Sequence, residues 1–128
     1  MDEILLYLSA CNGLIIDVRN NGGGNLTNAT LMAQRFTNEK ILTGYIQHKT
    51  GKGHNDFSDP TPIYVEPSNS IRWQKKVVVL TNRHSYSATN DFVNSMRCFP
   101  NVTLVGAKTG GGSGLPFSSE LTNGWGVR

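Results

Sequence analysis

Three short apolar runs dominate the sequence, and helix-like patterns follow the first two. The runs are Leu14–Val18, Val77–Thr81 and Val102–Val105. Runs with so little polar alternation are typical of strands that are buried on both faces of a parallel sheet. The helix patterns occupy residues 27–36 and 87–97. This order of strand, helix, strand, helix and strand predicts an α/β fold with a mostly parallel sheet flanked by helices.

Apolar spacing also predicts which faces of the helices are buried. Residues 2–10 place Ile4, Leu5 and Leu8 on one helical face, and Gly13 suits the left-handed position that follows a helix. The inner faces of the two later helices are expected to carry Ala29, Met32, Ala33 and Phe36, and Ala88, Phe92 and Met96.

The remaining segments predict a further strand and a terminal hairpin. Residues 41–49 are expected to form a strand, and residues 50–70 a polar loop with prolines. Segments 117–121 and 125–128 flank Asn123-Gly124, and Asn-Gly is a strong hairpin signal. Because the sequence stops inside the second of these strands, where a sheet edge would lack its packing partners, we expect residues 1–128 to be a truncated, partial domain.

Composition limits the class of protein. A chain of 128 residues, 38% hydrophobic and 16% charged, is typical of one folded domain. The net charge is +3, but the basic residues are dispersed, and Lys75-Lys76 is the only adjacent pair, so no nucleic-acid surface is expected. The apolar runs are too short to span a bilayer, and the acidic pair Asp2-Glu3 follows Met1, so we expect no signal peptide within these residues. Cys11 and Cys98 have apolar neighbours, which favours small buried side chains and leaves their disulfide state open.

Two turns follow the first two strands, and their chemistry is complementary. Residues 17–24 read DVRNNGGG, and consecutive glycines allow backbone N–H groups to approach an anion or a developing oxyanion. Residues 81–89 read TNRHSYSAT, which places a serine at the start of a helix. The carboxyl edge of a parallel sheet is where sites are built, so one turn can supply a nucleophile and the other an oxyanion donor.

Other interpretations of these motifs are simpler. A serine at a helix start is most often an N-cap, and a glycine triplet is most often only a turn. The glycine-rich stretch 110–114 does not fit a phosphate-binding loop, because no helix follows it and Ala107 precedes Lys108-Thr109. No Gly-x-Ser-x-Gly motif is present, which disfavours an α/β-hydrolase.

Three motifs together resemble the tail-specific, or C-terminal-processing, serine proteases. Residues 13–24 (GLIIDVRNNGGG) resemble an apolar strand followed by DLRNNxGG, and residues 78–89 (VVLTNRHSYSAT) resemble VLVNxxSASASE. Residues 104–111 (LVGAKTGG) resemble LVGExTFG. The motifs occur in the family order and cover residues 13–128. The resemblance implies the β-β-α superhelix shared with ClpP and crotonase-type proteins.

Carried over residue by residue, the family motif implies that Ser87 is the nucleophile. The oxyanion donors would be the N–H groups of Ala88 and Gly24, with Gly23 as the fallback. Asn90 stands where many members have Glu, and we expect it to alter the support of the helix start and not the chemistry.

The general base is where this chain departs from the family. In the Ser-Lys branch a lysine follows in the motif TFGKG, and the aligned position here is Gly112. Lys108 is nearby, but a lysine must be desolvated to act as a neutral base, and we expect it to be a surface residue. The loss of the lysine resembles the tricorn-like branch, which uses a His and a Glu from elsewhere. By that alignment the histidines at positions 48, 54 and 84 are all misplaced, so the base is expected outside this chain. For His84, three residues before Ser87, we expect a loop position that points away from the site.

The resemblance implies serine-type proteolysis through an acyl-enzyme by the complete protein. Unfolded proteins or C-terminal tails would be the substrates, the location extracytoplasmic, and no cofactor or metal is expected. The isolated chain is expected to be inactive. Interphotoreceptor retinoid-binding proteins resemble these proteases but bind apolar ligands, so a binding module is the alternative. A crotonase-type acyl-CoA enzyme is a weaker third option. The oligomeric state is left open.

Overall fold

The structure is a computed structural model that describes residues 1–114 and 118–127. Its elements follow the order that the sequence pattern predicts, and the structure adds the 3₁₀ helix η1 and the strand β3. In chain order they are α1 (Asp2–Tyr7), β1 (Gly13–Asp17), α2 (Leu26–Ala33), η1 (Gln34–Phe36), β2 (Ile41–Ile46), β3 (Thr61–Val65), β4 (Lys76–Thr81), α3 (Ala88–Met96), β5 (Val102–Gly106), β6 (Ser119–Glu120) and β7 (Gly126–Val127).

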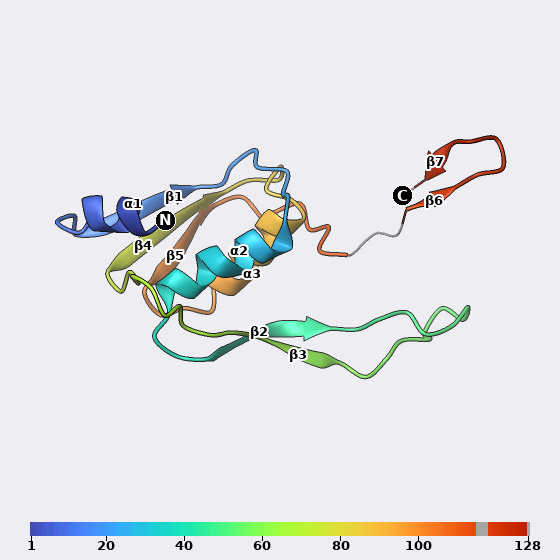
Figure 1. The fold of residues 1–128 in the computed structure, drawn as a ribbon, viewed down its shortest axis with the longest axis horizontal. Coiled ribbons are helices and arrows are strands. Elements are labelled where there is room, and N and C mark those ends of the chain that lie inside the picture. The colour runs from blue at the N-terminus through green and yellow to red at the C-terminus, as the bar shows by residue number, and fades with distance from the viewer. Residues whose placement is uncertain (115–117, 128) are drawn as a thin grey trace.

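The three predicted apolar strands form one parallel sheet. Its strand order is β1-β4-β5, with β4 in the centre. Ile15 pairs with Val78, and Val79 pairs with Leu104, so all three strands run in register toward the same carboxyl edge (Figure 1). The predicted mostly parallel sheet is confirmed.

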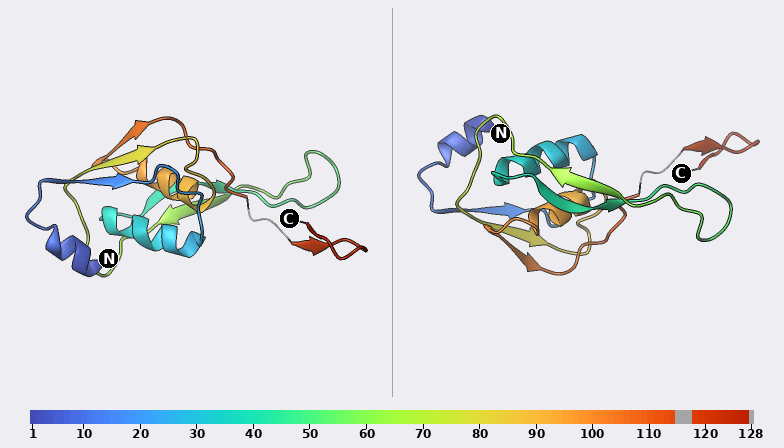
Figure 2. Two further views of the ribbon diagram at one scale, coloured as in Figure 1. Left: turned by 90° about the horizontal axis from the view of Figure 1, so that it is seen from above. Right: turned by 90° about the horizontal axis from the view of Figure 1, so that it is seen from below.

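Helices α2 and α3 cover one face of this sheet and lie between it and the β2–β3 hairpin (Figure 1, Figure 2). The predicted inner faces of both helices are confirmed. Ala33 and Phe36 are buried, as are Phe92 and Met96. The core that they form also includes Leu5, Val65, Trp73, Val77, Val79, Val93 and Phe99.

The prediction that all three strands are buried on both faces is wrong for the two edge strands. Val77 and Val79 of the central strand are 1% and 0% exposed, but Ile15 of β1 is 72% exposed. On β5, Leu104 and Val105 are also exposed. Within the described part of the chain, alternate residues of β1 remain accessible because the helices cover only one face of the sheet, whereas β5 is exposed on both faces from Thr103 to Gly106.

The N-terminal helix is shorter than predicted, and Gly13 has a different role. Helix α1 ends at Tyr7, and of its predicted apolar face Leu5 is buried whereas Ile4 is exposed. Gly13 is the first residue of β1 and not a left-handed residue after the helix. A Cβ atom at this position would lie 3.1 Å from the Lys76 carbonyl oxygen, so the close approach of β1 to β4 favours glycine here.

The segment predicted as one long loop contains a strand. Within residues 50–70, β3 pairs antiparallel with β2, which itself ends at Ile46 and not near Lys49. Pro62 lies in β3 opposite Tyr45, and a proline is tolerated in such a two-stranded sheet because one side of the strand has no ladder to complete. The missed signal is the short run Ile63-Tyr64-Val65.

The C-terminal hairpin forms where the Asn-Gly signal predicts it. Strands β6 and β7 pair antiparallel around a turn in which Gly124 has φ 83°. The hairpin stands apart from the sheet and helices in all the ribbon views (Figure 1, Figure 2). The predicted ends of its strands at Phe117 and Arg128 lie outside the described residues.

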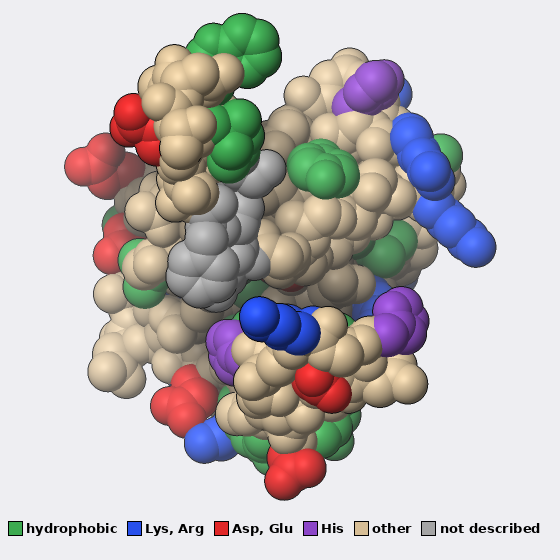
Figure 3. All heavy atoms as spheres, turned by 90° about the vertical axis from the view of Figure 1, so that its right-hand side faces the viewer, with side chains coloured by type: hydrophobic (Ala, Val, Ile, Leu, Met, Phe, Trp, Pro, Cys, Tyr) green, Lys and Arg blue, Asp and Glu red, His purple; other side chains and the backbone are tan. Residues whose placement is uncertain are grey.

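Three predictions from composition can be compared with the structure. Cys11 is exposed and Cys98 is partly buried, and both are free thiols, so the expectation of two buried cysteines is wrong for Cys11, which lies in the turn after α1. No helix among the described residues is long and apolar enough to cross a bilayer. On the face shown in Figure 3, Lys and Arg side chains do not merge into one continuous basic patch.

Candidate active site

The two predicted turns meet at the carboxyl edge of the sheet, because β1 and β4 are parallel neighbours that end side by side. Asp17 pairs with Leu80 at the last register position, and the Val18 N–H continues the ladder by donating to the Leu80 carbonyl at 3.0 Å. The glycine turn after β1 and the serine turn after β4 therefore begin from adjacent strand ends.

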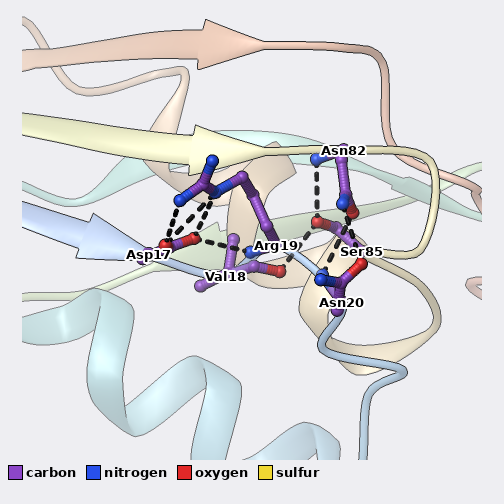
Figure 4. A network of polar contacts seen from close by, with 6 residues as sticks. All are labelled: Asp17, Val18, Arg19, Asn20, Asn82 and Ser85. Atoms are coloured by element: carbon purple, nitrogen blue, oxygen red, sulfur yellow. Dashed lines mark hydrogen bonds and ion pairs between the residues drawn. The ribbon is translucent and has the colours of Figure 1, made fainter.

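A network of short polar side chains fastens the two turns to each other (Figure 4). The Ser85 side chain is fully buried, and its hydroxyl donates to the Val18 carbonyl at 2.8 Å while accepting from the Asn82 N–H at 3.2 Å. The Asn82 side chain accepts from the Asn20 N–H at 3.0 Å and donates to the Asn20 side-chain oxygen at 2.9 Å. These bonds fix the two turns in one relative position.

An ion pair lies at the start of the glycine turn. The Arg19 guanidinium forms a two-pronged contact with the Asp17 carboxylate, with the shorter bond at 2.7 Å (Figure 4). Hydrogen bonds from the Arg19 side chain and backbone lower the pKa of Asp17 from 3.8 to about 2. Both side chains are about half exposed, so the pair orders the strand end more than it stabilises the fold.

Ser87 has a backbone conformation that a side-chain-bearing residue rarely adopts. It is the N-cap residue of α3, with φ 57° and ψ −129°. Its hydroxyl makes no capping hydrogen bond, in contrast to Asn25, whose side chain accepts from the Thr27 N–H at 2.8 Å at the start of α2. The interpretation of Ser87 as an ordinary capping serine is therefore wrong. Strained positions of this kind cluster at functional sites.

Gly23 approaches Ser87 so closely that no side chain fits between them. A Cβ atom at Gly23 would lie 2.7 Å from the Ser87 Cβ, 2.7 Å from the Tyr86 carbonyl oxygen and 3.0 Å from the Ala88 nitrogen. Gly23 also has φ 104°, which favours glycine. The glycine turn thus lies directly against the serine turn, the arrangement that the sequence predicts.

The hydrogen bonds of the glycine turn differ between Gly24, the predicted oxyanion donor, and Gly23, its fallback. The Gly23 N–H already donates to the Asn21 side-chain oxygen at 3.0 Å. Within residues 1–114 and 118–127, the N–H groups of Gly24 and Ala88 have no hydrogen-bond partner. Gly24 and Ala88 line the same pocket of about 310 Å³, together with Gly23, Asn21 and Phe92. Two residues whose N–H groups have no partner among the described residues therefore line one pocket beside the serine turn.

The whole chain, residues 1–128, matches the model of peptidase family S41. The chain belongs to peptidase family S41. This membership confirms the predicted resemblance to the C-terminal-processing proteases. The solved structures that match this chain also agree with the predicted α/β architecture.

Known proteins resemble this S41 chain over most of its length. A crystal structure of a candidate peptidase from Parabacteroides merdae is 60% identical with a TM-score of 0.92, covering 98% of this chain and 40% of that one. The tricorn protease of Thermoplasma acidophilum is 31% identical over 110 residues, 86% of this chain and 9% of its own. The photosystem II D1 C-terminal processing protease shares the fold, with 23% identity, a TM-score of 0.66, and coverage of 94% and 29%. The S41 chain therefore spans less than half the length of each.

The candidate bases of this S41 chain lie at exposed positions. His48 and His54 are on the β2–β3 hairpin and its loop, and His84 is in the turn after β4. Lys108 is exposed, as predicted. Among the described residues, none of these side chains hydrogen-bonds to the Ser87 hydroxyl. That the base lies outside the chain stays a prediction.

Sequence reasoning did not single out Asn21, which connects the two turns of the S41 site. Its side-chain oxygen accepts from the Gly23 N–H and, at 2.8 Å, from the Thr89 hydroxyl. Its carbonyl accepts from the Tyr86 N–H at 3.0 Å. An asparagine before a glycine turn is a signal of local hydrogen bonding, but its long-range partners Tyr86 and Thr89 are not readable from spacing.

Proposed function

We propose that Ser87 is the nucleophile of a serine peptidase. The observation that carries the proposal is the Ser87 hydroxyl, free of any capping bond at a strained turn that Gly23 closely approaches. A strand-to-helix turn with a strained serine exposes the hydroxyl for attack. Nearby, Gly24 and Ala88 line one pocket, and their N–H groups have no hydrogen-bond partner among the described residues.

In the proposed reaction the Ser87 Oγ attacks the carbonyl carbon of a peptide bond. The hydroxyl proton passes to a general base while the new C–O bond forms, and the carbonyl oxygen becomes an oxyanion. The N–H groups of Gly24 and Ala88 donate to that oxyanion, and each such donor contributes roughly 10²–10³ in rate. The C–N bond then breaks, the amine leaves with a proton, and water hydrolyses the acyl-enzyme.

The general base of the proposed reaction comes from outside these residues. A serine hydroxyl is a weak nucleophile until an adjacent group accepts its proton. The tricorn-like resemblance supports a His and a Glu from other parts of the complete protein. We infer that the 128 residues alone do not complete the catalytic machinery.

The substrate is an unfolded polypeptide or a C-terminal tail. Such a segment is bound as an added strand along a sheet edge, where its main-chain groups supply affinity and side-chain pockets supply specificity. The resemblance to C-terminal-processing proteases also supports an extracytoplasmic location of the complete protein.

Labelling with a fluorophosphonate tests the nucleophile. In the full-length protein the probe is expected to modify Ser87, identified by peptide mass spectrometry, and Ser87→Ala is expected to abolish labelling and cleavage of a tail peptide. Ser70→Ala, at an exposed loop serine, is the matched control and should change neither. Labelling that survives in Ser87→Ala contradicts the proposal. Tight binding of an apolar ligand without serine-dependent cleavage would instead favour a binding module.

A further inference from the structure

The glycine-rich segment Gly110–Gly112 runs alongside the serine turn like a short strand. Tyr86 and Gly111 form a parallel bridge. The Gly110 N–H donates to the Ser85 carbonyl at 2.9 Å, and the Ser87 N–H donates to the Gly111 carbonyl at 2.8 Å. The segment thus contacts the residues on both sides of Tyr86, and one of its bonds ends on the candidate nucleophile itself.

The Tyr86 ring occupies the space that side chains of this segment would need. A Cβ atom at Gly112 would lie 2.1 Å from the ring Cζ and 2.5 Å from both ring Cε atoms. At Gly110 it would lie 3.0 Å from the ring Cδ2 and 2.4 Å from the Arg83 carbonyl oxygen. Gly111 and Gly112 also have φ 81° and 75°, which favour glycine. A side chain at residue 112 would therefore have to displace the Tyr86 ring, which is 47% exposed, from its position against the segment.

The Asn90 side chain forms hydrogen bonds with the residues that flank the same segment on both sides. Its side chain is buried on α3, one turn after Ser87. The Thr109 hydroxyl donates to the Asn90 side-chain oxygen at 2.6 Å, and the Asn90 amide nitrogen donates to the Ser113 hydroxyl. The expectation that Asn90 alters the support of the helix start stays a prediction, and the bonds of its amide connect α3 to the residues that flank the glycine-rich segment.

From these contacts we infer that Tyr86 is a positioning residue for Ser87, acting through the glycine-rich segment. The ring packs against Gly110 and Gly112, which sets the Gly111 carbonyl where it accepts the Ser87 N–H and maintains the unusual Ser87 backbone. The inference rests on the proposed function. It also explains why residues 110 and 112 are glycines, with no need for a bound phosphate. A base at position 112, such as the lysine of the Ser-Lys branch, would have no room while the Tyr86 ring is in place.

Substitution of Tyr86 in the full-length protein tests the positioning role. Tyr86→Phe keeps the ring and is expected to retain kcat within about twofold. Tyr86→Ala is expected to lower kcat roughly 10- to 100-fold with little change in KM, because small displacements of a reacting group carry losses of that size. The rate of fluorophosphonate labelling should fall in parallel. If Tyr86→Ala does not fold by circular dichroism, Tyr86→Leu, which lacks the flat ring, takes its place.

An unchanged kcat in Tyr86→Ala or Tyr86→Leu overturns the inference. That result leaves the proposed function intact, provided that Ser87→Ala still abolishes cleavage. A purely structural role for Tyr86 would lower the unfolding temperature while kcat, measured well below that temperature, stays at the wild-type value. This outcome also overturns the inference.

A double-mutant cycle tests the mutual exclusion of the ring and residue 112. Gly112→Ala alone is expected to lower kcat at least tenfold, because the new methyl group displaces the ring. In the Tyr86→Ala background the same change should cost distinctly less, since the ring is gone. Gly114→Ala is the matched control, because Gly114 has ordinary backbone angles and open space at its Cβ position. Additive effects of Gly112→Ala and Tyr86→Ala contradict the inference.

Discussion

At the scale of single residues, the site depends on a glycine and a serine whose backbones are both unusual. Ser87 has φ 57°, and Gly23 has φ 104° and lies against it. A serine in such a conformation costs on the order of 1–3 kcal/mol, so its surroundings must hold it there. The Gly111 carbonyl accepts from the Ser87 N–H, and Asn21 accepts hydrogen bonds from Tyr86 and Thr89 on either side of Ser87. The geometry of the site therefore requires Gly23 to lie close to Ser87.

Gly23→Ala is expected to destroy this arrangement. The added methyl group would overlap the Ser87 Cβ and the Tyr86 carbonyl, and the positive φ would be strained. We expect peptide cleavage by the full-length protein to fall at least 100-fold and the free energy of unfolding to fall by about 1–3 kcal/mol. The measurements are kcat/KM on a tail peptide and urea unfolding.

Gly22→Ala is the neighbouring control for that substitution. A Cβ atom at Gly22 meets nothing within 4 Å, and its φ is not positive. Near-normal activity is expected for Gly22→Ala. Equal losses in the two variants would mean that the glycine turn needs general flexibility, and not close approach at Gly23.

At the scale of elements, the site is an assembly of two strand-to-helix turns that begin on neighbouring parallel strands. The parallel pairing of β1 and β4 brings the turns together, and the buried Ser85 hydroxyl joins them by bonding to the Val18 carbonyl and the Asn82 N–H. Ser85 stands two residues before Ser87, so the same turn carries one structural serine and one candidate nucleophile.

Ser85→Ala tests this division of roles. Removing the hydroxyl leaves the Val18 carbonyl with only the longer bond from the Asn21 N–H, at 3.3 Å, and takes the acceptor from the Asn82 N–H, which is expected to lower the free energy of unfolding by about 1–3 kcal/mol. Urea unfolding of the full-length protein measures the change, and Ser70→Ala, at an exposed position, should stay within about 0.5 kcal/mol. Unchanged stability of Ser85→Ala would show that the turns are joined mainly by the Asn20–Asn82 pair.

At the scale of the whole molecule, the described chain carries a candidate nucleophile and oxyanion donors but no hydrogen-bonded base. This S41 chain spans less than half the length of each of the three relatives named above. Among the described residues the helices cover one face of its sheet, and Ile15 of β1 is 72% exposed. The lack of a hydrogen-bonded base agrees with the proposal that groups outside these residues complete the site.

The purified 128 residues are therefore expected to show no serine-dependent cleavage of casein or a tail peptide. The physical reason is that none of the described residues accepts a hydrogen bond from the Ser87 hydroxyl, so no group is in place to take its proton. A circular dichroism spectrum establishes that the isolated chain is folded, and the full-length protein serves as the active control. Robust cleavage by the folded 128 residues, lost in Ser87→Ala, would show that a base is present among them.

Local patterns in the sequence were enough to predict the parallel sheet, the two helices that start at the turns, and the pairing of a glycine turn with a serine turn. Apolar periodicity and turn residues report such features directly, because they depend on neighbours along the chain. The β3 strand was missed, since its short run depends on pairing with β2. The exposure of Ile15 and Val105 was also missed, because a continuous apolar run does not say whether both faces of a strand are covered.

Contacts between distant segments decided the rest. The positive φ of Ser87, the bond from the Gly23 N–H to Asn21 that leaves the Gly24 N–H unpaired, and the packing of Tyr86 on Gly112 all require segments from different strands to meet. Spacing along the chain predicts which residue types reach the sheet edge. It does not predict which amide is already bonded there, because a hydrogen bond depends on distances of a few ångströms that only the packed structure sets.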